Sequence, residues 1–173
     1  TLVCTSVIVG GLSAVMAGED HLQLVPKFLT KLVKEANERG VVCGNHDEDG
    51  KKPKSYVSKV IDGIEMSYVF PKNRKKALSR IEMRIYHGKE KEDVDSAYSV
   101  FKHYLSKKSE IEMAYGGPLN WNEGTRTAFY IRQDYHDFQL SDVSRWEYWI
   151  EKIVTDMNKL DDALRPHHSN SRN

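Results

Sequence analysis

Three short stretches of alternating apolar side chains, at residues 56–61, 64–70 and 78–86, constrain the fold more than any other feature of the sequence. The first two are separated only by Asp62-Gly63, a dipeptide that favours a tight turn because both residues tolerate positive φ. Side chains two residues apart in a strand share a face. One face therefore collects large apolar residues, namely Ile64, Met66, Tyr68, Phe70, Ile81, Met83 and Ile85. We predict an antiparallel meander of three strands.

Helical periodicity flanks this meander. Apolar residues recur every three or four positions over residues 22–39 and 92–115, and again in a last helix that begins at Ser141 or Asp142. In that last helix Trp146 and Trp149 lie about one turn apart. Aromatic rings with this spacing on an amphipathic helix usually fill a core, so we expect both rings to be buried.

Two more strands are predicted outside the meander, at residues 2–9 and 126–133. The order of elements is then strand, helix, three strands, helix, strand, helix. It predicts an α+β fold, with a largely antiparallel sheet of four or five strands covered by long amphipathic helices. At 173 residues the chain can bury one substantial core. We predict a single domain over residues 1–166 and a flexible tail over residues 167–173.

Composition excludes several classes of function. Lys and Arg number 26 against 25 Asp and Glu, so the net charge of +1 creates no general attraction for a polyanion. The cysteines, Cys4 and Cys43, are too few for a disulfide framework or a zinc site, which fits a reducing, cytoplasmic compartment. Gly, Ser and Thr dilute the apolar residues 1–18, so no membrane partner is expected.

Basic side chains are concentrated in two predicted loops. One loop carries Lys51, Lys52 and Lys54, and the other carries Lys72, Arg74, Lys75 and Lys76. If both loops lie at one edge of the sheet, they form a phosphate-binding patch together with residues of the strands. The expected neighbours in the strands are Arg80, Arg84, Tyr86, Arg126, Tyr130 and Arg132. The sequence therefore predicts nucleic acid as a partner.

An enzymatic alternative depends on acidic residues of the meander. Asp62, followed by Glu82-Met83-Arg84, is similar to the D…E-x-K pattern of restriction-type nucleases, in which two acids hold Mg²⁺. Arg84 stands where that pattern has lysine, and arginine cannot act as a base at neutral pH. The tetrapeptide at residues 44–47 is typical of metallophosphoesterases, but their other ligands are missing here. We expect no catalysis, metal or cofactor, and the alternative is a divergent Mg²⁺-dependent nuclease that uses Asp62, Glu65 and Glu82.

The segment from the third meander strand onward resembles a known bacterial family, catalogued as domain of unknown function 4268. The resemblance is carried by Arg80-Ile81-Glu82-Met83-Arg84-Ile85-Tyr86, Tyr98, Phe101, Leu105, Lys108, Ile111-Glu112, Gly116-Gly117, Leu119-x-Trp121 and Asp142…Trp146…Trp149. It spans residues 24–166. Members of that family often look like the carboxy-terminal part of proteins with a restriction-type nuclease at the amino-terminal end, in prokaryotic defence contexts.

This resemblance implies an accessory or recognition domain that works with a fused or associated nuclease. The sequence leaves one further alternative open, a protein-interaction or homo-oligomerisation domain that uses an exposed sheet edge.

Overall fold

The computed structural model describes residues 21–39, 56–61, 64–70, 78–87, 90–123 and 128–170. The α-helices in this part are α1 (His21–Glu38), α2 (Lys91–Ser106), α3 (Lys108–Tyr115) and α4 (Trp146–Leu164). The strands are β1 (Tyr56–Ile61), β2 (Ile64–Val69), β3 (Ser79–Tyr86), β4 (Asn120–Asn122) and β5 (Ala128–Tyr135). Two short 3-10 helices, η1 (Val143–Arg145) and η2 (Arg165–Asn170), precede and follow α4.

The strands form one sheet in the order β1-β2-β3-β5-β4, and every neighbouring pair is antiparallel. Ile61 lies opposite Ile64, and Met66 lies opposite Met83, which confirms the predicted meander. β5 pairs with β3 along the whole length of both strands, although two helices separate them in the sequence. The predicted α+β fold with a largely antiparallel sheet is confirmed.

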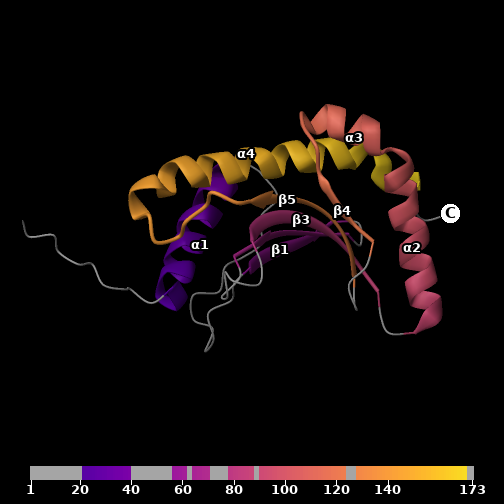
Figure 1. The fold of residues 1–173 in the computed structure, drawn as a ribbon, viewed down its shortest axis with the longest axis horizontal. Coiled ribbons are helices and arrows are strands. Elements are labelled where there is room, and N and C mark those ends of the chain that lie inside the picture. The colour runs from indigo at the N-terminus through magenta and orange to yellow at the C-terminus, as the bar shows by residue number, and fades with distance from the viewer. Residues whose placement is uncertain are drawn as a thin grey trace, which may run out of the picture.

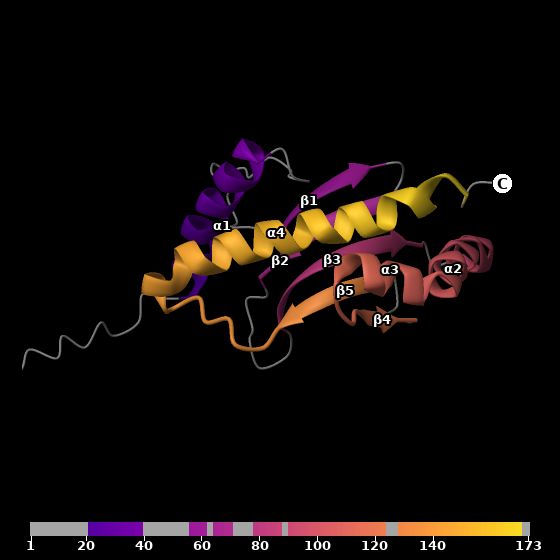
Figure 2. The same ribbon diagram turned by 90° about the horizontal axis from the view of Figure 1, so that it is seen from above.

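The hydrophobic core lies between one face of the sheet and the helices. Figures 1 and 2 show α4 running across this face, with α1 beside the end where α4 begins. The ring of Phe28 in α1 lies 5.0 Å from that of Phe70 and 5.3 Å from that of Trp146. Trp149 packs against Phe138 with ring centroids 5.5 Å apart. Both tryptophans are buried, as predicted, and this aromatic cluster fixes how α1 and α4 dock on the sheet.

The single helix expected over residues 92–115 is wrong, because the chain forms two helices that meet at Lys107. Phe101 of α2 stacks on Phe129 of β5, with ring centroids 5.3 Å apart. Ile111 and Tyr115 of α3 are buried where α3 packs against α4. One straight helix could not bury both sets of side chains, and Figure 1 shows the change of direction between α2 and α3.

Other differences concern β4 and the end of α4. β4 is a three-residue edge strand that was not predicted, and it pairs with β5 through Trp121 and Ile131. His168 was expected in a flexible tail, but it lies in η2 and is buried, with its ring 6.1 Å from that of Tyr104. The ring contact of His168 with Tyr104 joins η2 to α2. The strand predicted at residues 2–9 lies outside the described residues.

Gly116 ends α3 in a left-handed conformation, with φ of 92°, and its N–H donates to the Glu112 carbonyl at 3.0 Å. A Cβ atom at this position would meet no other atom within 4 Å, so only the backbone conformation disfavours a side chain. We therefore expect Gly116→Ala to lower the free energy of unfolding by about 1 kcal/mol in urea denaturation.

Gly117 is the matched control for this prediction. A Cβ atom at Gly117 would likewise meet no other atom within 4 Å, but the φ of Gly117 is not positive. Gly117→Ala should leave the stability unchanged or raise it slightly, because alanine restricts the unfolded chain. Equal losses in the two variants would contradict this explanation.

Candidate functional site

The second face of the sheet carries the polar side chains. No described helix lies against it, and it is the concave side of the arch seen in Figure 1. We call it the open face. Its described residues, assigned from the strand register, are Tyr56, Ser58, Val60, Glu65, Ser67, Val69, Arg80, Glu82, Arg84, Tyr86, Asn120, Asn122, Ala128, Tyr130, Arg132 and Asp134. The register therefore brings arginines, carboxylates, amides and tyrosines from five strands to one surface.

Each described arginine of the open face lies beside a carboxylate. Nε of Arg80 is 2.6 Å from Oε2 of Glu82. Nη1 of Arg84 is 3.6 Å from Oε2 of Glu65, and Nε of Arg132 is 3.3 Å from Oδ1 of Asp134. We call these three pairs the ion-pair ladder. Three positive and three negative charges cancel, so the ladder has no net charge.

Glu82 lies at the centre of the ladder and is only 4% exposed. Its direct neighbours across the sheet are Ser67 on β2 and Arg132 on β5. Burial of a carboxylate is costly unless a partner compensates its charge, and the Arg80 guanidinium does so here. Arg80 also donates to the Leu78 carbonyl at 3.2 Å. The Arg80 guanidinium therefore compensates the charge of Glu82 and holds its carboxylate in place.

The guanidinium groups of Arg84 and Arg132 make fewer hydrogen bonds within the described part of the chain than that of Arg80. Within the described part of the chain, the buried Nε of each has no hydrogen-bond partner. Arg84 instead lies against two aromatic rings, 5.6 Å from the centroid of Tyr86 and 5.9 Å from that of Tyr130. Guanidinium groups stack on aromatic faces and keep their in-plane donors available. These two arginines can therefore turn donors toward a ligand.

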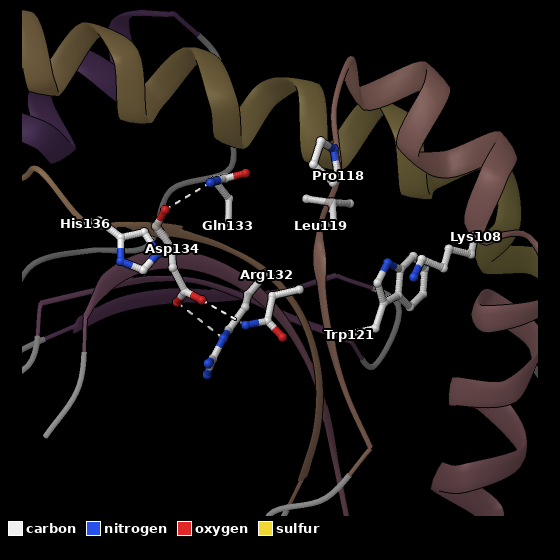
Figure 3. A pocket seen from close by; sticks show the side chains of 9 residues that line it. Lys108, Pro118, Leu119, Trp121, Arg132, Gln133, Asp134 and His136 are labelled. Atoms are coloured by element: carbon white, nitrogen blue, oxygen red, sulfur yellow. Dashed lines mark hydrogen bonds and ion pairs between the residues drawn. The ribbon is translucent and has the colours of Figure 1, made fainter.

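An open pocket of about 470 Å³ adjoins the open face beside β4 and β5 (Figure 3). Its polar lining includes Lys108, Asn120, Trp121, Arg132, Asp134 and His136. Asn120 Nδ2 donates to Asp134 Oδ2 at 3.0 Å, and Figure 3 shows Arg132 at the other oxygen of the same carboxylate. Asp134 is thus held by two donors, and Arg132 belongs to both the ladder and the pocket.

Glu112 of α3 fixes one wall of this pocket. Its Oε1 accepts hydrogen bonds from the Trp121 indole N–H at 3.0 Å and from the Leu119 N–H at 2.9 Å. Burial alone would raise the pKa of the Glu112 carboxyl. The two hydrogen bonds and the Lys108 ammonium outweigh burial and lower the pKa below its ordinary value. The ionised Glu112 therefore orients Trp121, and Lys108 lies 6.0 Å from the ring centroid.

The structure brings together some of the predicted site residues. Arg80, Arg84, Glu65 and Glu82 meet on the open face. Asp62, the basic residues Lys51, Lys52, Lys54, Lys72, Arg74, Lys75 and Lys76, and the expected neighbour Arg126 lie outside the described residues. Asn120 and Asp134 were missed. Alternation along residues 128–135 could have placed Asp134 beside Arg132, but nothing in the sequence marked β4 as a strand.

Each described acidic residue of the open face, Glu65, Glu82 and Asp134, lies beside an arginine. In residues 21–39, 56–61, 64–70, 78–87, 90–123 and 128–170, no three His, Cys, Asp or Glu side chains are grouped so that they could hold a metal ion. Glu65 and Glu82 lie on neighbouring strands of the open face, each next to a guanidinium. Each of these two carboxylates is therefore paired with an arginine.

Comparison with known proteins gives one match. A family model described as Domain of unknown function (DUF4268) matches residues 26–168. No curated protein and no solved structure matches the chain. The helices of the described part include none that is long and apolar enough to cross a membrane.

The buried pair in the ladder predicts a large stability effect. Glu82→Gln keeps the shape of the side chain but leaves Arg80 without its counter-charge. We expect the free energy of unfolding to fall by about 3 kcal/mol. Glu110→Gln is the control, because its ion pair with Lys107 is exposed and should contribute about 1 kcal/mol or less. Similar small losses in both variants would show that the buried Arg80–Glu82 pair stabilises the fold no more than an exposed ion pair does.

Glu112 predicts a pH dependence with a definite sign. A carboxyl whose pKa is lowered by folding stabilises the protein above its unfolded pKa, and this contribution is lost as the pH falls through the folded pKa. Glu112→Gln retains the acceptor oxygen but not the charge. The unfolding free energy of this variant should be lower than that of the wild-type protein, and the difference should be largest near neutral pH and should shrink in acid. Urea titrations of both proteins across this range test it, and a constant deficit would contradict it.

Proposed function

The chain belongs to the family described as Domain of unknown function (DUF4268), and from its open face we propose that it is a noncatalytic recognition domain that binds nucleic acid. The observation that carries this proposal is the position and incomplete hydrogen bonding of the Arg84 and Arg132 guanidinium groups. Both guanidinium groups lie on the face against which no described helix packs, their side chains are 29% and 24% exposed, and the buried Nε of neither has a hydrogen-bond partner among the described residues. A phosphate oxygen accepts charge-assisted hydrogen bonds from guanidinium and matches its planar fork of donors.

The order of the strands favours a cluster of basic residues at one end of the sheet. Tyr56, the first residue of β1, lies opposite Val69, which lies opposite Arg80 on β3. The sequence that carries Lys51, Lys52 and Lys54 leads into Tyr56, and the sequence that carries Lys72, Arg74, Lys75 and Lys76 joins β2 to β3. Both basic segments are therefore attached to the same end of the described sheet. This arrangement favours a shared phosphate-binding patch.

The ladder limits how strong this binding is. Because its charges cancel, a phosphate must compete with Glu65 or Asp134 for a guanidinium that already has an ion pair. Salt-dependent attraction then depends mainly on the lysine-rich segments. We propose a domain of moderate affinity that works beside a restriction-like or defence nuclease in the cytoplasm. The fused or associated nuclease is implied by the family resemblance and is part of this proposal.

Replacement of Arg84 or Arg132 by alanine should weaken the binding of nucleic acid. We expect Arg84→Ala and Arg132→Ala each to raise the Kd for a fluorescein-labelled oligonucleotide roughly three- to tenfold, because a charge-assisted hydrogen bond contributes about 1.5–3 kcal/mol before competition by the carboxylates is subtracted. Fluorescence anisotropy at low and moderate salt, with single strands and duplexes of one sequence, gives these values. Arg145→Ala is the control, because Arg145 lies over Tyr148 and Trp149 of α4 and not on the sheet.

Two results would overturn this proposal. The first is no binding of either nucleic acid by the wild-type protein at low salt. The second is cleavage of the oligonucleotide in the presence of Mg²⁺ that Glu82→Gln abolishes, because this would favour the nuclease that uses Asp62, Glu65 and Glu82. Thermal unfolding of each variant ensures that only folded protein is compared.

A further inference from the structure

We infer that the nucleic acid bound by the open face is single-stranded, and that Tyr86, Arg84 and Tyr130 form the surface on which its bases stack. This inference rests on the proposed function and specifies its ligand. It concerns the end of the sheet opposite to the one where the basic segments are attached.

Arg84 lies beside the rings of both tyrosines on the open face. Arg84 lies directly opposite Tyr130 in the β3–β5 register, and Tyr86 follows Arg84 on the same face of β3. The guanidinium carbon of Arg84 is 5.6 Å from the centroid of Tyr86 and 5.9 Å from that of Tyr130. Arg84 therefore bridges rings that come from two neighbouring strands. Bases stack both on aromatic rings and on guanidinium planes.

Tyr86 is the most exposed aromatic residue among the described Phe, Tyr and Trp side chains. Tyr86 is 64% exposed, whereas Ile85 beside it in the sequence is buried on the helix side of the sheet. The ring contributes little to the core, yet it stands next to Arg84 on the open face. A ligand with a flat apolar surface would cover it and remove that surface from water.

The charge balance of the open face distinguishes single strands from duplexes. A duplex is bound mainly by neutralising its phosphates, and the ladder offers three arginines that are already balanced by three carboxylates. The bases of a duplex are also hidden within its own stack. A single strand exposes its base faces, and stacking contributes about 1–3 kcal/mol per base with little dependence on charge. An electrically neutral face with exposed rings therefore suits a single strand.

The length of the open face sets the size of the ligand. Tyr86 and Arg80 are six residues apart on β3, which corresponds to about 20 Å at the usual rise per residue. Sheets that present aromatic rings in this way stack about two or three bases. Asn122 lies opposite Tyr130, so an amide stands beside the stacking surface. From there the sugar-phosphate backbone of the nucleic acid can follow β5 toward Arg132 and the pocket next to Lys108.

The test compares a labelled single-stranded oligothymidine of ~10 nucleotides with a duplex of the same length, by fluorescence anisotropy. We expect the single strand to bind at least tenfold more tightly than the duplex. Tyr86→Ala should weaken binding of the single strand roughly fivefold or more, because one stacked base is lost. Tyr86→Phe keeps the ring and should retain wild-type affinity. Tyr148→Ala is the control, because Tyr148 is also exposed but lies on α4.

The possible outcomes separate this inference from the proposed function. If the duplex binds as tightly as the single strand, or if Tyr86→Ala leaves the Kd unchanged while Arg84→Ala raises it, stacking is refuted and nucleic-acid binding stands. If neither ligand binds, both conclusions fall. Since Tyr86 is exposed, its replacement should not unfold the domain, and an unchanged melting temperature would show this.

Discussion

β3 pairs with β2 on one side and with β5 on the other, and its register decides which side chains of the sheet meet the helices. In the observed register Ile81, Met83 and Ile85 face α4 and the core, while Arg80, Glu82 and Arg84 face the opposite side. A shift by one residue would exchange the two sets. Three charged side chains would then lie under helices without water, at a cost of several kcal/mol each. The apolar core and the charged face are therefore consequences of the same pairing.

The register also explains why Glu82 can be charged and buried at once. Its neighbours along β3 are Arg80 and Arg84, and the residue opposite on β5 is Arg132. Only Arg80 makes a hydrogen bond with it, at 2.6 Å. The other two arginines lie beside Glu65 and Asp134, which come from different strands. The Arg80–Glu82 and Arg132–Asp134 pairs each lie within one strand, whereas the Arg84–Glu65 pair joins β3 to β2 and therefore favours the observed register of these two strands.

The sequence predicts those parts of the fold that are set by local periodicity. Alternation in residues 56–61, 64–70 and 78–86 identified β1, β2 and β3, and the helical pattern identified α1 and α4. The break at Lys107 could not be predicted, because neither Gly nor Pro marks it. It arises because α2 packs on β5 while α3 packs on α4. β4 was missed for a similar reason, since three residues are too few to show a period and become a strand only by pairing with β5.

The same distinction applies to the candidate site. The alternation of Glu82 and Arg84 with apolar residues placed them on the polar face, as the structure shows. The burial of Glu82 was not predictable, because it depends on Arg80 and on neighbours from β2 and β5. A guanidinium that is positioned by a carboxylate loses little side-chain freedom when it meets a phosphate, but it must give up part of an existing ion pair. For the proposed recognition domain, orientation and selectivity would then increase at the expense of affinity.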